Sequence, residues 1–239
     1  MIQCLVDKGA DVLAVNKKGR TALLDSLRSN YEEGSEILIK HGSSVQVADR
    51  DGNTALHFAV HEPSLLKQIK KGGDVNAVNL RCCTPLHQAA YCGYALDTTR
   101  RLLKTGANVH CRDDQGNTPL HVAVAHAGES IVDLLIKNGS DVHATNIQGK
   151  TCLHMIARFG DGEVLEKLIA CRVQVNAVDE LGSTALHRAV LENDQWLVEG
   201  LLRHGADPEA VDFKGCTSLH VGCCSGTKEA VFVMINHGR

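Results

Sequence analysis

Thr118-Pro119-Leu120-His121 is the stretch that decides the fold, because the chain repeats it at a nearly constant interval. The threonine and histidine of the full copies are Thr54 and His57, Thr84 and His87, Thr118 and His121, Thr151 and His154, Thr184 and His187, and Thr217 and His220. A degenerate copy begins at Thr21, and successive threonines are 33, 30, 34, 33, 33 and 33 residues apart. A fixed period in this range indicates an array of repeat units that stack on their neighbours.

Each copy of the motif predicts the start of a helix. A threonine in the N-cap position satisfies backbone N–H groups that the first turn leaves without partners. A proline, where present, suits the first helical position because the missing N–H costs nothing there. The histidine three residues after the threonine can return a hydrogen bond to the threonine, as Glu or Gln does in a capping box. We therefore expect a structural role for these histidines.

The composition excludes several classes of function. The 239 residues carry a net charge of −3, with acidic and basic residues mixed throughout. The absence of a basic block argues against nucleic acid or an anionic membrane as a partner. No apolar run approaches the ~20 residues that span a bilayer, so we expect no direct membrane insertion in this segment. Aromatic residues make up 3% of the chain, which is adequate only for thin layers of aliphatic side chains.

The ten cysteines do not have the pattern of a disulfide scaffold. Cys82-Cys83 and Cys223-Cys224 are adjacent pairs, and the other cysteines have no recurring partner. We expect no signal peptide, because the segment after Met1 becomes charged at Asp7. Reduced thiols are typical of proteins inside the cell. The expected location is the cytoplasm, with the nucleus as the alternative.

Residues 113–145 carry the resemblance to a known family. They contain Asp113, Gly116 and Thr118-Pro119-Leu120-His121, then Val132, Leu135 and Ile136, and finally Gly139 and Asp141-Val142-His143-Ala144. This order closely resembles the ankyrin repeat, and nearly the whole chain follows it. The resemblance implies an all-α solenoid of about seven stacked helix–turn–helix units with β-hairpin-like turns.

The repeat pattern divides the chain into units. A partial repeat at 1–15 is followed by repeats at 16–48, 49–78, 79–112, 113–145, 146–178 and 179–211, and by a truncated one at 212–239. Neither end has the polar face of a terminal repeat, so we expect an excerpt of a longer array. The unit from Asp49 is three residues short, and Cys82 replaces a turn glycine. We expect the weakest junction between residues 60 and 85.

The sequence offers no foothold for catalysis, a cofactor or a metal. Gly149-Lys150-Thr151 resembles the end of a phosphate-binding loop, but Ala144 occupies the position of the other required glycine. The pair Cys83 and His87 has a spacing seen in metal sites, yet the histidine already has a partner in its threonine. We therefore expect no enzyme activity.

The resemblance implies a partner protein bound on the concave face, which the turn tips and the ends of the first helices form. The candidate partner-binding residues are Tyr91, Ile147, Arg158, Phe159, Leu181, Leu191 and Phe213. Clustered exposed apolar residues mark interaction sites. The alternative is that these side chains pack on neighbouring turns. We expect a monomeric scaffold or adaptor that does not bind nucleic acid.

Two other classes of function stay open. The chain is consistent with the substrate-recognition or targeting portion of a larger enzyme complex, such as a ubiquitin-ligase receptor or a phosphatase regulatory subunit. It is also consistent with the ankyrin segment of a membrane channel or toxin.

Asn76 and Asn176 occupy the position that an asparagine hydroxylase modifies in similar repeats. Asn76 has an acidic residue two positions before it, whereas Asn176 has a leucine eight positions before it. The alternative is a turn asparagine that bonds its own backbone.

Overall fold

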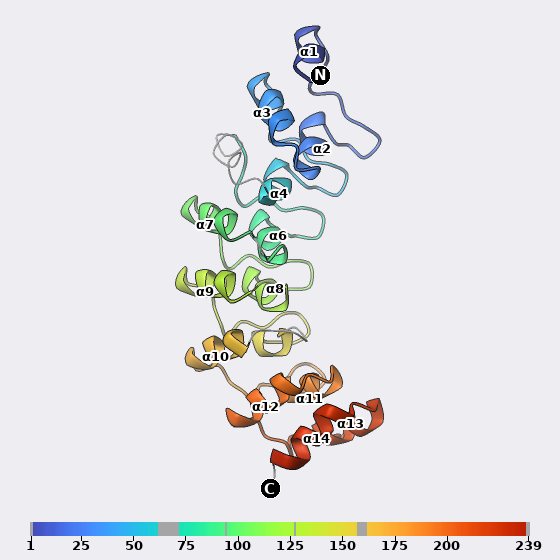
Figure 1. The fold of residues 1–239 in the computed structure, drawn as a ribbon, viewed down its shortest axis with the longest axis vertical. Helices are drawn as coiled ribbons and strands as arrows, with labels where there is room; N and C mark the ends of the chain where they lie inside the picture. The colour runs from blue at the N-terminus through green and yellow to red at the C-terminus, as the bar shows by residue number, and fades with distance from the viewer. Residues whose placement is uncertain (1, 62–71, 94, 127, 157–161, 238–239) are drawn as a thin grey trace. The chain divides into compact units, whose positions relative to one another are not determined.

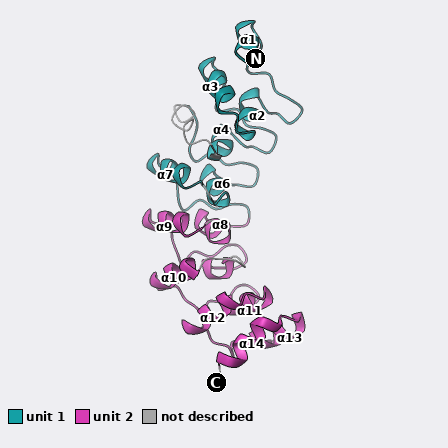
Figure 2. Ribbon diagram, in the orientation of Figure 1, with its two compact units in different colours: residues 1–114 teal, residues 115–239 magenta. Residues whose placement is uncertain are grey.

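The computed structural model describes residues 2–61, 72–93, 95–126, 128–156 and 162–237. The chain forms two compact units, Met1–Asp114 and Gln115–Arg239 (Figure 2). Each unit is built from short antiparallel helices joined by long turns (Figure 1).

Unit 1 contains three first helices and the second helices that pack beside them. Its elements are α1 (Ile2–Asp7), α2 (Ala22–Arg28), α3 (Glu32–Lys40), α4 (Ala55–Phe58), the 3-10 helix η1 (Ala59–His61), α6 (Pro85–Tyr91) and α7 (Leu96–Lys104). Helix α2 packs on α3 and α4, and α6 packs on α4 and α7. The first helices α2, α4 and α6 therefore form one row of the unit, with α3 and α7 in the other (Figure 1).

Unit 2 repeats this arrangement with more layers. Its elements are α8 (Pro119–His126), α9 (Glu129–Lys137), the 3-10 helix η2 (Cys152–Met155), α10 (Gly162–Ala170), α11 (Ala185–Leu191), α12 (Gln195–Arg203), α13 (Ser218–Ser225) and α14 (Lys228–His237). The first helices stack in the order α8, η2, α11 and α13, and the second helices in the order α9, α10, α12 and α14. Each helix pair is one layer.

The prediction of an all-α fold with hairpin-like turns is confirmed for the described residues. They contain no strand, and regular structure outside the helices is limited to single antiparallel bridges. The bridges join Val15 to Thr21, Val178 to Thr184 and Val211 to Thr217. Each bridge closes a turn immediately before a helix, so it fixes where the motif threonine begins that helix.

The core is a series of thin aliphatic layers. The leucine of each motif copy is buried from Leu23 to Leu186, whereas Leu219 in the last copy is partly exposed. The second helices bury fewer residues. Leu102, Leu135 and Leu168 are buried, but the apolar residue that follows each of them is only half-buried. Leu201 and Leu202 are both buried.

Two layers have shortened first helices. At Thr54 the helix is four residues long and continues as the 3-10 helix η1. At Thr151 the expected α-helix is a 3-10 helix, which ends where Ile156 adopts an extended backbone with ψ 125°. The junction expected to be weakest includes residues 62–71, which lie outside the described residues. Weakness there stays a prediction.

Candidate functional site

The tips of the long turns in unit 2 share one local geometry. In each, an Asp or Asn side chain accepts hydrogen bonds from two backbone N–H groups further along the turn. Asp179 Oδ1 accepts from Leu181 at 2.9 Å and from Ser183 at 3.0 Å. Gly182 then reverses the chain with φ +75°, a conformation that a side chain disfavours. The two residues between the acidic anchor and the glycine, here Glu180 and Leu181, are left at the tip.

The same anchoring recurs along the chain. Asp212 Oδ1 accepts from Lys214 at 2.8 Å and from Cys216 at 2.9 Å, and the Cys216 hydrogen bond is the main reason that the pKa of Asp212 lies below its ordinary value. Equivalent pairs of hydrogen bonds are made by Asn16, Asp49, Asn79 and Asn146. No role was predicted for these anchors from the sequence. Their signal is an Asp or Asn five residues before every motif threonine.

A ladder of backbone hydrogen bonds connects successive tips within each unit. In unit 2, Ile147 donates to Gln115 at 3.0 Å, Glu180 to Gln148 at 2.9 Å and Phe213 to Leu181 at 3.0 Å. In unit 1 the equivalent bonds are Arg50 to Lys18, Leu80 to Asp51 and Asp114 to Arg81. The ladder holds neighbouring tips at a fixed separation, whatever side chains they carry.

Three of the candidate partner-binding residues lie at consecutive tips of unit 2. Ile147, Leu181 and Phe213, here named the turn-tip row, are 56%, 68% and 78% exposed. The ladder joins Leu181 directly to Phe213, and it joins the turn of Ile147 to that of Leu181 through Gln148 and Glu180. Exposed apolar side chains held on a fixed backbone suit a binding surface, because little conformational entropy remains to be lost on binding.

The row also makes contacts with the turns beside it. The Phe213 ring lies against Gly182, where a Cβ atom would come within 2.7 Å of it, and a methyl group of Ile147 lies against Gly116 in the same way. The alternative, that these side chains pack on neighbouring turns, therefore applies to one edge of Phe213 and of Ile147. The opposite edge is exposed to solvent.

The remaining candidates lie elsewhere. Leu191 ends α11 and is about half-exposed, and Tyr91 ends α6 in unit 1 with a similar exposure. Arg188 and Glu192, beside Leu191, form an ion pair at 3.0 Å. Arg158 and Phe159 lie outside the described residues. Tyr91 belongs to unit 1 and is not part of the turn-tip row.

The motif histidines are held by their threonines. In all six full copies, histidine Nδ1 accepts the threonine backbone N–H at 3.1–3.3 Å and lies 2.8–3.0 Å from the threonine hydroxyl. Because Nδ1 accepts, the proton is on Nε2. That nitrogen donates to the next layer from His57 to Cys83, from His121 to Lys150, from His154 to Ser183 and from His187 to Cys216, at 2.9–3.2 Å. Each of these four rings therefore caps its own helix and bonds to the following turn.

Burial keeps two of these rings neutral. Removal from water is the main cause that lowers the pKa of His57 and of His154 below the ordinary value of 6.5, against the opposing effect of the carbonyl that each ring contacts. Within the described part of the chain, no group of three or more His, Cys, Asp or Glu side chains is arranged to hold a metal ion. The geometry of the histidines is that of layer-to-layer contacts.

All ten cysteines lie in the described ranges, and no disulfide joins them. Burial raises the pKa of Cys152 to about 12, so this thiol stays protonated at neutral pH. Burial also raises the pKa of Cys83 and of Cys92. Cys82, Cys223 and Cys224 are exposed.

Asn76 and Asn176 do not bond their own backbone. The Asn176 amide donates to Gly205 O at 3.0 Å and accepts from Asp207 N at 2.8 Å, both in the next layer. Asn76 bonds Gly106 O and Asn108 N in the same way. The expected alternative, a turn asparagine closing on itself, is wrong because the side chain crosses to the following turn.

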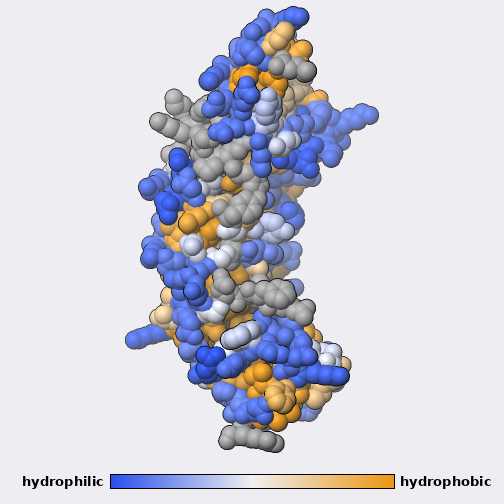
Figure 3. All heavy atoms as spheres, in the orientation of Figure 1, coloured by the Kyte–Doolittle hydropathy of each residue, from blue (hydrophilic) through white to orange (hydrophobic). Residues whose placement is uncertain are grey.

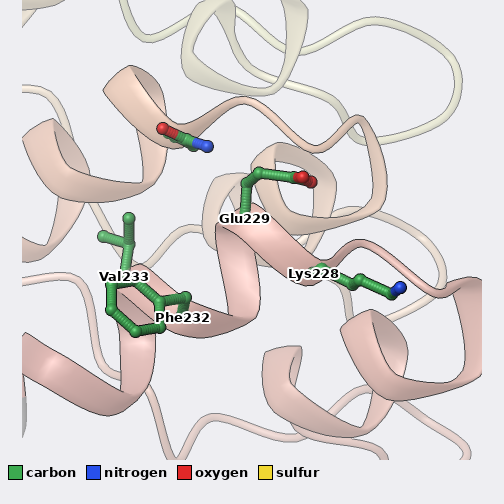
Figure 4. A pocket seen from close by; sticks show the side chains of 5 residues that line it. Lys228, Glu229, Phe232 and Val233 are labelled. Carbon is green, nitrogen blue, oxygen red and sulfur yellow. The ribbon is translucent and has the colours of Figure 1, made fainter.

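Unit 2 also has two hollows on its surface. A groove of about 440 Å³ lies between two turn stems, with Val142, Leu153, Val173 and Val178 among its lining residues. A second hollow of about 310 Å³ is formed by Gln195 of α12 and by Lys228, Glu229, Phe232 and Val233 of α14 (Figure 4). Phe232 and Val233 lie side by side there, and Lys228 points away from them. Neither hollow contains a cluster of titratable groups suited to catalysis.

No helix within the described ranges is long and apolar enough to cross a membrane.

Comparison with known proteins gives a match over the whole chain. A family model described as ankyrin repeats, in three copies, matches residues 1–79, 60–146, 124–212 and 153–239. The successive matches overlap and together reach from the first residue to the last.

Several curated proteins are similar over about half of the chain. A putative ankyrin repeat protein of fowlpox virus, FPV031, is 30% identical over 145 residues, which cover 56% of this chain and 42% of the relative. The mouse B-cell lymphoma 3 protein homolog is 30% identical over 131 residues, which cover 52% of this chain and 29% of the relative. The chicken Arf-GAP with coiled-coil, ANK repeat and PH domain-containing protein 2 is 35% identical over 132 residues. The alignment covers 52% of this chain and 16% of that relative. The chain therefore spans less than half the length of each of these relatives.

Proposed function

Because the chain belongs to the ankyrin repeat family, a protein–protein interaction module, we propose that it binds a partner protein through its turn tips and catalyses no reaction itself. The observation that supports this most is the turn-tip row, Ile147, Leu181 and Phe213. The row is apolar and exposed, and its backbone is fixed by the ladder of hydrogen bonds. The fold needs only the backbone at these positions, so their side chains are available for recognition.

The row fits an apolar segment of a partner. Complete burial of a Leu or Phe side chain contributes about 1.5–3 kcal/mol. Each 1.4 kcal/mol of binding free energy corresponds to about tenfold in affinity. Removing Leu181 and Phe213 together is therefore expected to weaken binding on the order of a thousandfold, if both become buried against the partner.

The test compares a row variant with a matched surface variant. The double variant Leu181→Ser, Phe213→Ser removes apolar tips, and Trp196→Ser removes an equally exposed side chain from α12. The tagged chains are used to capture proteins from source-cell extract, which mass spectrometry identifies. A partner should be captured by the wild type and by Trp196→Ser but not by the double variant, with helicity unchanged in circular dichroism. Capture of the same proteins by all three chains would overturn the proposal, and loss of helicity in the double variant would favour packing.

A second candidate is the recognition portion of a larger enzyme complex. It is supported by the chicken relative, whose name combines ANK repeats with other domains. The alignment covers only 16% of that relative. In the same capture experiment, this candidate predicts that enzyme subunits co-purify with both variants, while a substrate protein is lost with the row variant. If no enzyme subunit co-purifies with any of the chains, the simple adaptor is favoured.

We further propose that the chain works in the cytoplasm or nucleus. The support is that no disulfide joins the ten cysteines, which fits a reducing compartment. Imaging of the tagged chain, with compartment markers as controls, tests this proposal. Accumulation in the secretory pathway would contradict it.

A further inference from the structure

One position in the stems of the long turns holds an asparagine whose carboxamide crosses to the next layer. In unit 2, Asn176 donates to Gly205 O at 3.0 Å and accepts from Asp207 N at 2.8 Å. In unit 1, Asn76 makes the same two hydrogen bonds, at 3.2 and 2.8 Å. A backbone carbonyl and the N–H two residues after it thus hold one carboxamide, and they are here named the amide-binding pair.

One amide-binding pair in the middle of unit 2 faces a histidine instead. His143 is 33 residues before Asn176, and the corresponding pair is the Arg172 carbonyl and the Gln174 N–H. Within the described part of the chain, the His143 ring makes no hydrogen bond, and neither member of this pair has a partner. An imidazole is a poor substitute for a carboxamide there, because its donor and acceptor nitrogens point in divergent directions.

The backbone around this pair resembles that of the filled pairs. Arg172 has φ +59°, in the same left-handed region as Gly205 at +85°. The turn therefore has the same hand, and its carbonyl and N–H follow the end of a second helix in the same order. The difference between the two layers is the side chain that faces the pair, His143 in one and Asn176 in the other.

The groove of about 440 Å³ between two turn stems lies at this pair, because both His143 and Gln174 line it. Its apolar lining consists of Val142, Leu153, Val173, Ala177 and Val178. Ligand sites are typically hollows of roughly 300–1,000 Å³ with mostly apolar walls and a few polar groups that fix orientation. On the face that Figure 3 shows, hydrophobic patches alternate with hydrophilic side chains, so the polar pair gives the groove a feature that apolar area alone does not.

We propose that this groove binds an extended segment of a partner protein that presents an asparagine between small apolar residues. The partner's carboxamide accepts from the Gln174 N–H and donates to the Arg172 carbonyl, as Asn176 does with the next layer. Its apolar neighbours pack on the valines of the groove. The chain's own crossing segment, Val175-Asn176-Ala177, has this composition. None of the residues of the turn-tip row lines the groove, so this site is separate from that row.

Substitutions at His143 separate a filled pair from an accessible one. His143→Asn supplies the chain's own carboxamide, which should bond the pair, raise the midpoint of urea unfolding and exclude the partner. His143→Gln is a second variant of this kind, because Gln46 at the same stem position donates to Gly72 O at 2.9 Å. His143→Ala is the matched control, since it removes the same exposed ring without adding a carboxamide. Circular dichroism checks helicity in each variant.

The probe is a synthetic Val-Asn-Ala-Val peptide, acetylated at its N-terminus and closed by a methylamide, so that its asparagine is its one primary carboxamide. Titration into the ¹⁵N-labelled chain should shift the Gln174 N–H signal in the wild type and in His143→Ala. In His143→Asn and His143→Gln, affinity should fall by about tenfold or more. A peptide with Asp in place of Asn should also bind about tenfold more weakly, because a carboxylate cannot donate to the Arg172 carbonyl.

Three results would overturn the proposal. A Gln174 signal that does not respond to the Asn peptide in the wild type would show that the pair binds no carboxamide. Equal affinity for the Asn and Asp peptides would mean that the carboxamide is not recognised. Undiminished binding by His143→Asn and His143→Gln with intact helicity would place the peptide elsewhere. The Leu181→Ser, Phe213→Ser variant should bind the peptide like the wild type, so this experiment is independent of partner binding at the turn-tip row.

Discussion

His154 donates through Nε2 to the carbonyl oxygen of Ser183, 3.0 Å away, across the boundary between two layers of unit 2. Its Nδ1 accepts the Thr151 N–H at 3.2 Å, so the neutral ring uses both nitrogens. A protonated ring has no acceptor, and the Thr151 N–H would then lose its partner. The contact between these layers depends on an uncharged imidazole.

The chain should lose stability as the pH falls below about 6.5. Burial lowers the pKa of His57 and of His154 from 6.5 in the folded chain. Between the lowered pKa and 6.5, the unfolded chain therefore binds more protons than the folded chain, and the free energy of unfolding decreases as the pH falls through this window. Urea unfolding at a series of pH values measures the effect. The variant His154→Gln lacks one titrating group and should have a shallower pH dependence; an unchanged slope would contradict this assignment.

Cys82→Gly and Arg172→Gly should each stabilise the chain by about 0.5–1 kcal/mol. Both residues have positive φ, +55° and +59°, where a side chain is strained by roughly 1–3 kcal/mol and the entropy lost by glycine offsets part of the gain. The midpoint of thermal or urea unfolding tests this. In contrast, Gly149→Ala should destabilise, because its Cβ would lie 2.9 Å from the Glu180 backbone nitrogen as well as requiring φ +71°. A loss of stability in both Cys82→Gly and Arg172→Gly would contradict the argument that their side chains are strained.

Asn176→Ala should destabilise the chain by about 1–2 kcal/mol, because two hydrogen bonds to the next layer are lost. Asn138→Ala is the control, since among the described residues this exposed side-chain amide bonds only Leu134 O in the same turn of helix. Urea unfolding of both variants gives the comparison. Equal effects of the two substitutions would mean that the crossing contacts of Asn176 contribute nothing beyond a local bond.

Hydroxylation of Asn76 or Asn176 stays a prediction. Incubation with an asparagine hydroxylase that acts on ankyrin repeats, followed by peptide mass spectrometry, should show the gain of one oxygen atom on either residue. The Asn→Ala variant at the same position is the control. An unmodified peptide under conditions that modify a known substrate would exclude it.

Cys152 should resist alkylation in the folded chain while the exposed thiols react. Burial raises its pKa to about 12, so almost no thiolate forms at pH 8. Cys82, Cys223 and Cys224 are exposed and should be labelled first by iodoacetamide. Peptide mass spectrometry after short labelling measures this order, and labelling in urea provides the control. Early labelling of Cys152 would mean that its layer opens readily.

The sequence was sufficient for the helix starts, because the N-cap chemistry of Thr184 and the capping by His187 depend on residues three positions apart. The resemblance to a known repeat placed Leu181 and Phe213 at turn tips, and both residues are exposed. It did not predict that η2 replaces an α-helix after Thr151, since the end of that helix depends on the neighbouring layers. The crossing hydrogen bonds of Asn176 were missed for the same reason, as their partners are about thirty residues away.

Each tip is held by its Asp or Asn anchor and by backbone hydrogen bonds alone. This affects how the protein can evolve. The two positions that follow each anchor, before the turn glycine or the Cys82 that replaces it, differ at every turn: Lys17-Lys18, Arg50-Asp51, Leu80-Arg81, Asp114-Gln115, Ile147-Gln148, Glu180-Leu181 and Phe213-Lys214. If the turn tips bind the partner as proposed, mutation at these positions changes what is recognised while the scaffold beneath keeps its hydrogen bonds. A lineage can therefore acquire a new binding preference by single substitutions, without a compensating change in the interior.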